Sequence, residues 1–281
     1  MKNVHMLVAT DFSSTWIDRL PDLAKFLAML NCTVSMVHVL TSPFKLWLEA
    51  DSLELQAQER LEHWLRLMRE QGITTDQALI RTGNAAEEII LAAQELAADS
   101  IMIAADAKRS FLGSTAEAVV RNAHCSVWVV HTPHATTLQH IVCACDMSRA
   151  SAKALQHAYY LAEQSQARLD ALYCLELPDT NTLGMSKSQA EETYRSHKTR
   201  ISQEFEQFIA ATLGMSTLAS HINVHVMWGK PSNTILTFAG DAHVDVIVLG
   251  AKGKSNLQIL TLGSTAHNIL RSSRCSLYIV R

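Results

Sequence analysis

The sequence predicts an α/β protein made of two tandem, doubly wound, five-stranded parallel sheets. Three observations lead to this prediction: the chain repeats itself, each half alternates short apolar runs with longer amphipathic stretches, and most of the short runs are apolar on both faces. Such runs suit parallel strands that are buried between two layers of helices. The 281 residues suffice for two domains with a core each.

The internal repeat is visible as three pairs of matching blocks. These are Val4–Ser13 with Gln139–Ser148 (offset 135), Gly83–Ile89 with Gly229–Ile235 (offset 146), and Gly113–Ala116 with Gly263–Ala266 (offset 150). The growing offset indicates insertions in the second copy. Matching blocks in the same order in both halves are the signature of a repeated structural unit.

Each copy is predicted to contain five strands in the same order. The strands are expected near 4–9, 33–39, 77–81, 100–105 and 126–130, and again near 140–145, 168–174, 222–227, 245–250 and 275–280. Helices are expected near 46–70, 150–165, 187–213, 231–242 and 264–272. The polar, proline-containing segment 131–137 reads as a linker, so the predicted domains are 1–132 and 138–281.

Composition and charge exclude several classes of protein. A net charge of −3 argues against a nucleic-acid binder. Residues 1–135 hold 11 basic and 16 acidic side chains, and the remainder holds 13 and 11, so an anionic ligand would favour the second half. No apolar run approaches the roughly 18 residues of a membrane helix, and no signal-peptide pattern opens the chain. Six cysteines, mostly within apolar runs, indicate reduced thiols and a cytoplasmic protein.

A glycine-rich segment in the second half carries the strongest functional signal. Gly250 ends a predicted strand, Gly253 follows, and Gly263 immediately precedes the helix predicted over 264–272. Glycine lets the backbone approach a ligand closely or adopt a positive φ. The free N–H groups of a helix start, with the helix dipole behind them, bind phosphate oxygens. The segment therefore predicts a phosphate-binding loop.

Polar side chains in the same segment favour that prediction. The hydroxyls of Ser264 and Thr265 add hydrogen-bond donors, and Lys252 and Lys254 add positive charge. The alternative is that the glycines are turn residues and that Ser264 only caps the helix. The order strand, loop, helix favours the phosphate loop.

Asp146 is expected at the same edge of the second sheet, because it follows the strand over 140–145. Open parallel sheets bind ligands beyond the carboxyl ends of their strands, where the strand order reverses. With the order 3-2-1-4-5, Asp146 and Gly250 would flank one pocket, and the carboxylate would accept from an amine or a sugar hydroxyl. The alternative is that Asp146 caps the following helix, which is the interpretation favoured for Asp11 in the first half.

The spacing Gly-x-x-Gly, nine residues, Gly-Ser/Thr resembles the ATP loop of the universal stress proteins. The strand-end Asp146, the turn at Gly229-Lys230-Pro231 and the final strand Ser276–Val280 also resemble that family, and the likeness extends over both halves. The resemblance implies five-stranded sheets of order 3-2-1-4-5, like those of adenine nucleotide α hydrolases. It also implies ATP in the second half, with Mg²⁺ as a candidate companion.

The same resemblance assigns roles to individual residues. Asp146 and the strand end near Cys174 would lie by the adenosine, and the ribose and phosphates would be lined by Gly250, Gly253, Gly263, Ser264 and Thr265. The family also pairs its last strands across a two-fold axis. Segments 126–130 and 275–280 would then pair within one chain, as an internal pseudo-two-fold domain pair, with a homodimer as the alternative.

The first half departs from the pattern. Ala104 and Ala107 stand where the first two glycines belong, only five residues separate Ala107 from Gly113, and Asp106 would repel phosphate. We therefore expect no ATP in the first domain.

No metal site and no catalytic machinery is predicted. His131, His134 and His140 with Cys143 and Cys145 form the densest set of potential metal ligands, but the two cysteines share one face of a predicted strand. Nucleophile-elbow and P-loop motifs are absent. The leading hypothesis is a cytoplasmic stress protein with ATP as a regulatory or structural ligand. The alternatives are a weak ATPase or adenylyl-transfer enzyme, and an adaptor, apolar-ligand or zinc module using the first domain.

Overall fold

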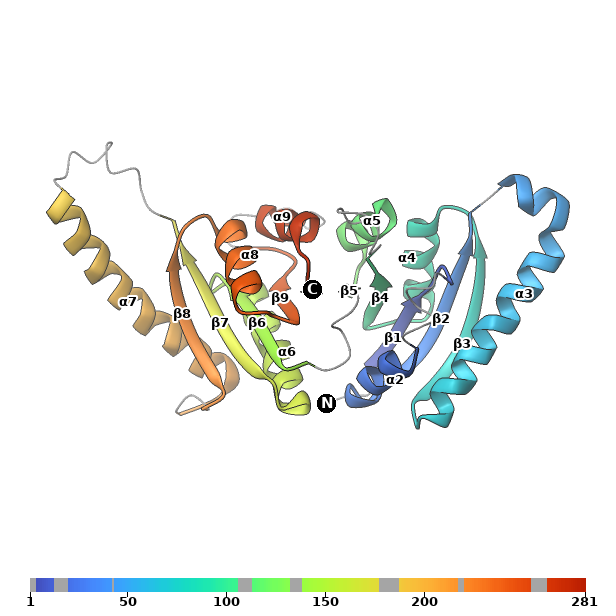
Figure 1. Ribbon diagram of the computed structural model, residues 1–281, viewed down its shortest axis with the longest axis horizontal. Helices are drawn as coiled ribbons and strands as arrows, with labels where there is room; N and C mark the ends of the chain where they lie inside the picture. Colours follow the sequence, from blue (N-terminus) through green and yellow to red (C-terminus); the bar gives the residue numbers. More distant parts are fainter. Residues whose placement is uncertain are drawn as a thin grey trace. The chain divides into compact units, whose positions relative to one another are not determined.

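The computed structural model describes residues 4–12, 20–41, 43–105, 113–131, 138–176, 187–216, 220–253 and 262–281. The chain divides into two compact units. The first comprises Met1–Thr137 with Arg274–Ile279, and the second comprises Leu138–Ser273 with Val280–Arg281. In Figure 1 each unit is a sheet with helices on both of its faces.

The elements of the first half alternate strand and helix. They are β1 (Val4–Ala9), α2 (Leu20–Met29), β2 (Cys32–Leu40), α3 (Pro43–Glu70), β3 (Thr74–Thr82), α4 (Ala85–Glu95), β4 (Ser100–Ala104), α5 (Ser114–Asn122) and β5 (Ser126–Val130). The helix predicted near 46–70 corresponds to α3, on which Leu61, Trp64, Leu65 and Met68 form one buried stripe.

The second half repeats this alternation. It contains β6 (His140–Cys145), α6 (Arg149–Ser165), β7 (Arg168–Leu175), α7 (Lys187–Leu213), β8 (Ile222–Trp228), α8 (Pro231–Asp241), β9 (Val246–Gly250), α9 (Ser264–Ser272) and β10 (Ser276–Val280). Helices α6 and α7 pack against each other, as do α8 and α9. This pairing is what a doubly wound sheet requires, because its two sets of crossover helices cover opposite faces.

The strand order confirms the predicted fold class. In the first unit β3-β2-β1-β4-β5 are all parallel, and in the second half β6 pairs in parallel with both β7 and β9, with β8 beyond β7. The central strands are apolar throughout, as Val246, Ile247 and Val248 illustrate with no exposed surface. The connections diverge to opposite faces next to β1 and next to β6.

The last strand, β10, adds an antiparallel pairing to the parallel ones. Most of it falls within Arg274–Ile279, which belongs to the first unit. There β10 pairs with β5 in antiparallel register, with Leu277 opposite Val129. The rings of Trp128 and Tyr278 stack with centroids 4.1 Å apart on this strand pair. The pairing of segments 126–130 and 276–280 is the one that the resemblance implied.

No helix within the described residues combines the length and the apolar character needed to cross a bilayer. The domain limits 1–132 and 138–281 stay a prediction.

Candidate functional site

The candidate site lies where β6 and β9 end side by side in the second unit. The two strands pair in parallel with Ala144 opposite Leu249. The segments that follow them, which begin with Asp146 and Ala251, therefore leave from the same edge of the sheet. This edge is the reversal point of the strand order, where open α/β sheets hold their ligands. The predicted neighbours Asp146 and Gly250 are thus brought to one place.

The two ends of the candidate loop are joined by a hydrogen bond. The N–H of Gly263 donates to the carbonyl oxygen of Ala251 at 2.8 Å, and the N–H of Ala251 donates to the carbonyl oxygen of Val280 at 2.8 Å. Ala251 is buried, with 2% of its surface exposed. These bonds fix both ends of the loop against the end of the sheet. Lys254 lies outside the described residues.

None of the three loop glycines needs an unusual backbone angle, and close packing requires glycine at Gly250 and Gly253 only. Gly250, Gly253 and Gly263 are absent from the positive-φ residues of the described chain, and Gly263 has φ −62°. A Cβ at Gly250 would lie 2.9 Å from the carbonyl carbon of Ala150, at the start of α6. A Cβ at Gly263 would lie 3.5 Å from the oxygen of Ala251, which is ordinary contact. Glycine at 250 therefore lets β9 end against α6.

Gly253 lies against the carboxylate of Asp146. A Cβ at Gly253 would be 2.8 Å from Oδ2 of Asp146. The other oxygen, Oδ1, accepts a hydrogen bond from the N–H of Ser148 at 3.0 Å. Between them Met147 has φ 59°, a left-handed angle that makes the chain turn sharply after β6. Ser148, and not Asp146, is the N-cap of α6, because its Oγ accepts from the N–H of Ser151.

The start of α9 presents backbone donors towards the loop. Gly263 is its N-cap residue and makes no side-chain cap, and the first intrahelical bond runs from His267 to Gly263. The N–H groups of the first turn have no acceptor within the helix. That turn holds no acidic residue, and Ser264 is exposed while Thr265 is half-buried. This is the donor arrangement expected of an anion site.

Lys252 and Cys174 are the two remaining described residues of the predicted site. Lys252 is half-buried, and its Cα would lie 3.7 Å from a Cβ at Gly263. Cys174 lies near the end of β7, half-buried, and its Sγ contacts the carbonyl oxygen of Pro231 at 4.0 Å. Burial, followed by the nearby Glu176, raises the pKa of Cys174 to about 12. Its thiol is therefore neutral at physiological pH and lies against the start of α8.

The corresponding strand end of the first unit is built differently. Phe12, which follows the exposed Asp11, is 9% exposed. Its ring lies 4.5 Å from the ring of His38 and 5.6 Å from that of Trp64, and the guanidinium carbon of Arg60 is 4.3 Å from its centroid. These side chains pack together at the end of the first strand. Of the residues that depart from the glycine pattern, Asp106 and Ala107 lie outside the described part of the chain, and Ala104 is half-buried at the end of β4.

The second helix start also differs between the units. At Gly113, the counterpart of Gly263, a Cβ would meet no atom of the described part of the chain within 4 Å. The first turn of α5 carries Glu117, which pairs with Arg121. A carboxylate there takes the position that favours an anion in the second unit. The first unit therefore lacks several features of the candidate anion site.

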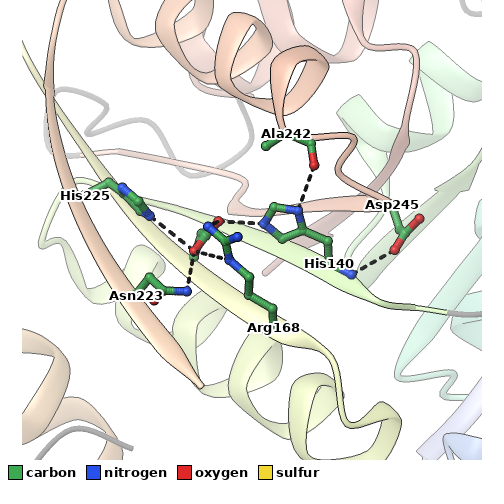
Figure 2. Close-up of polar contacts among 7 residues, drawn as sticks. His140, Arg168, Asn223, His225, Ala242 and Asp245 are labelled. Carbon is green, nitrogen blue, oxygen red and sulfur yellow. Dashed lines mark hydrogen bonds and ion pairs between the residues drawn. The ribbon is translucent and has the colours of Figure 1, made fainter. Parts of the chain in front are cut away.

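A buried polar network lies at the opposite, amino-terminal edge of the second sheet (Figure 2). Its centre is Asp170 of β7, whose side chain has no exposed surface. The carboxylate accepts from Nε2 of His140 at 2.6 Å, from Nε of Arg168 at 3.0 Å, from Nδ2 of Asn223 at 2.9 Å and from Nε2 of His225 at 3.2 Å. The network therefore ties together β6, β7 and β8.

The charge of this network follows from its contacts. Burial by itself raises the pKa of Asp170, but the hydrogen bonds from His140, Arg168, Asn223 and His225 more than reverse that effect and hold it well below its usual range. Nδ1 of His140 lies 3.0 Å from the carbonyl oxygen of Ala242, at the end of α8. The network thus stabilises a buried carboxylate and anchors α8 to the sheet.

The first unit carries a variant of the same network. His5, the repeat partner of His140, contacts Oγ of Ser35 at 2.9 Å through Nε2, and Ser35 donates to Asp76 at 3.2 Å. The acid lies on β3, the counterpart of β8, and not on β2, the counterpart of β7, and Asp76 is 46% exposed. The sequence indicated only that His5 and His140 match. The role of Asp170 was missed, although a lone acid within an apolar run is a signal for a buried ion pair.

The cysteine pair of β6 is a packing feature. Sγ of Cys143 and Sγ of Cys145 are 3.6 Å apart and buried on one face of the strand, as predicted. Across the described ranges no three His, Cys, Asp or Glu side chains are grouped so as to hold a metal ion. His134 lies outside those ranges.

Comparisons with known proteins point to one protein family. A model of the Universal stress protein family matches residues 3–131 and again residues 137–281. Universal stress protein MJ0531 of Methanocaldococcus jannaschii is 26% identical over 142 residues, which are 50% of this chain and 81% of that protein. Universal stress protein YxiE of Bacillus subtilis is 30% identical over 146 residues, which are 49% of this chain and 95% of that protein.

A solved structure extends the likeness to both halves at once. A universal stress protein from Archaeoglobus fulgidus aligns over 99% of this chain and 96% of its own, with a TM-score of 0.73 and 20% identity, which speaks for the fold alone. The family model matches twice, and each of the two curated relatives spans about half of the chain. The chain therefore belongs to the universal stress protein family and is of the tandem type, with two such domains in one polypeptide.

Proposed function

We propose that the chain binds ATP in its second domain, residues 138–281, as a regulatory or structural ligand in a stress response. Polyphosphate would bind the first-turn N–H groups of α9, next to Gly263, with Ser264 and Thr265 as further donors. The ribose or adenine would reach the carboxylate of Asp146. Lys252 and Lys254 would contribute positive charge, and Cys174 would border the nucleoside.

One observation carries this proposal. The first turn of α9 has neither a side-chain cap nor an acidic residue, and it lies at one end of the candidate loop. The other end of that loop follows β9 and lies beside Asp146. Backbone donors at a helix start favour a phosphate, and a carboxylate a short distance away favours the hydroxyl or amine of a nucleoside. The net charge of +2 after residue 135 (13 basic and 11 acidic side chains) agrees with an anionic ligand.

ATP would act by stabilising the folded state of the second domain. A ligand that binds only the folded state stabilises it by about 2.7 kcal/mol at a free concentration of 100 times Kd. For a unit of this size that corresponds to a rise in Tm of roughly 5–10 °C. Binding would therefore stabilise the second domain and would bias the contacts that this edge of its sheet makes with other molecules.

Calorimetric titration of the full chain with ATP, with and without Mg²⁺, tests the proposal. We expect one site per chain and a loss of at least tenfold in affinity for Gly263→Val, because the added methyl groups would crowd the loop backbone. Gly113→Val is the matched control, because a Cβ there meets no atom of the described residues within 4 Å. Unchanged affinity in folded Gly263→Val, or two sites per chain, would contradict the assignment.

The wider assignment follows from the same proposal. We expect the first domain, residues 1–132, to leave ATP unbound and the protein to work in the cytoplasm, in agreement with six cysteines that form no disulfide. An internal pseudo-two-fold domain pair predicts a monomer, and light scattering coupled to gel filtration would distinguish it from a homodimer. Release of ADP from the titration samples, abolished by Asp146→Ala, would favour a weak ATPase instead.

A further inference from the structure

The contact between Gly253 and Asp146 divides the candidate site into two parts. Resting on the proposed ATP function, we propose that Gly253 is a positioning residue that makes room for the Asp146 carboxylate, and that it belongs to the nucleoside part of the site and not to the phosphate part. The phosphate contacts then fall to the start of α9. This assigns different tasks to glycines that the sequence pattern treats alike.

The backbone of Gly253 does not explain why glycine stands there. Gly253 is not among the positive-φ glycines, so an alanine would meet no conformational strain. What an alanine would meet is Oδ2 of Asp146, 2.8 Å from the Cβ position. Among the described residues, the next nearest atom is Cγ of the same carboxylate, at 3.9 Å. The space beside Gly253 is therefore shaped by Asp146.

An alanine at 253 would displace the carboxylate and leave the fold in place. A separation under 3.0 Å cannot persist, and the end of an aspartate side chain moves more easily than backbone does. Moving it would break the hydrogen bond that Oδ1 accepts from the N–H of Ser148 at 3.0 Å. The start of α6 would keep its own cap, because Ser148 Oγ still accepts from Ser151.

The charge of Asp146 assigns the contact to the nucleoside. A carboxylate accepts hydrogen bonds from hydroxyls and amines and repels a phosphate at short range, most strongly where water is scarce. A phosphate that approached the backbone of Gly253 would lie beside Oδ2. The first turn of α9 has no acidic residue and is the favourable place for the polyphosphate.

Titration with two ligands separates the two tasks. Full-length wild type, Gly253→Ala, Asp146→Ala and the double variant are titrated with ATP and with inorganic tripolyphosphate. We expect Gly253→Ala to weaken ATP binding about tenfold, the loss typical of one charge-assisted hydrogen bond, and to change tripolyphosphate binding less than twofold. The double variant should bind ATP no more weakly than Asp146→Ala, because the two changes act on one contact.

Two controls make the outcomes distinct. Gly113→Ala adds the same methyl group at the matching helix start of the first unit, where no atom of a described residue lies within 4 Å of it, and should change neither affinity. The backbone amide resonance of Ser148, measured without nucleotide, should shift in Gly253→Ala while that of Ser151 stays in place. This reports the displaced carboxylate whether or not nucleotide binds.

Equal losses for ATP and tripolyphosphate in Gly253→Ala would overturn the inference, as would losses that multiply in the double variant or an unmoved Ser148 resonance. Failure of the wild type to bind either ligand would instead refute the proposed function. A shifted Ser148 resonance would in that case still support the steric role of Gly253.

Discussion

Removal of the Asp170 carboxylate should destabilise the second unit strongly. The side chain has no exposed surface and accepts hydrogen bonds from four side chains, two of which come from the neighbouring strand β8. Removing one partner of a buried ion pair costs about 3–5 kcal/mol, because the remaining groups stay buried and unpaired. Arg168 is 52% exposed and can turn to water, so the lower end applies to Asp170→Ala, about 3 kcal/mol.

Asp170→Asn should cost less, about 1–2 kcal/mol. The amide oxygen still accepts hydrogen bonds of the kind that Asn223 donates, and most of the packing is kept. The charge is lost, and the amide NH2 replaces one acceptor by a donor that faces other donors. This variant separates the contribution of the charge from that of the cavity which alanine leaves.

The contribution of Asp170 should depend on pH in a defined direction. Its pKa is lowered in the folded state, so the folded protein binds the proton more weakly than the unfolded chain does. The stabilisation is therefore fully present above the usual pKa of an aspartate, about 3.9, and is lost as the pH falls below that value. The difference in stability between wild type and Asp170→Asn should stay constant from pH 7 to about pH 5 and shrink below pH 4.

Urea denaturation followed by far-UV circular dichroism measures these differences, and hydrogen exchange of peptides from β6 and β7 locates them. Asp76→Asn in the first unit is the matched control, because Asp76 is 46% exposed and lies 3.8 Å from Nε2 of His5. It should cost less than 1 kcal/mol. A cost below 1 kcal/mol for Asp170→Ala, or a wild-type advantage unchanged down to pH 3, would refute the reasoning.

Three further predictions concern the candidate site. Gly250→Ala should destabilise the second unit by about 1–3 kcal/mol in urea denaturation, since the methyl group would lie 2.9 Å from the backbone of Ala150; an unchanged midpoint would show that α6 moves freely. Burial and the nearby Glu176 raise the pKa of Cys174 to about 12, so this thiol should react with a disulfide reagent at pH 8 far more slowly than it does in the unfolded chain. Equal rates would contradict its burial. Ser264→Asp should raise the stability of the free protein by about 0.5 kcal/mol through the helix dipole while weakening ATP binding at least tenfold; calorimetry that finds tighter binding would argue against a phosphate at the start of α9.

The local pattern of the chain determined most of its secondary structure. The predicted strand 140–145 and helices 187–213 and 264–272 match β6, α7 and α9 at both ends. Runs apolar on both faces mark strands of a parallel sheet, and these signals lie within single elements. Strand β3 was harder to delimit: the prediction near 77–81 covers only part of Thr74–Thr82, because an exposed edge strand carries polar residues that interrupt the apolar run.

The glycine spacing located the candidate site from the sequence, but it did not reveal what each glycine does. Glycine at position 250 leaves room for the backbone of α6, and glycine at position 253 leaves room for the carboxylate of Asp146. Neither of these neighbours is adjacent in sequence. A glycine in a sequence pattern indicates only that a side chain does not fit at that position. Which atom excludes it depends on how separate elements pack.

The sequence by itself determined the tandem repeat, the α/β class and the edge of the sheet where a ligand site is to be sought, because these depend on periodicity and on the order of elements along the chain. Only the tertiary structure decided the antiparallel register of β10 on β5, a pairing that the family resemblance implied, and only it showed that His140, Asp170 and His225 form one buried network. These contacts join residues 30 to about 150 positions apart, and partner choice at that distance depends on the packing of the whole sheet, which no local pattern encodes.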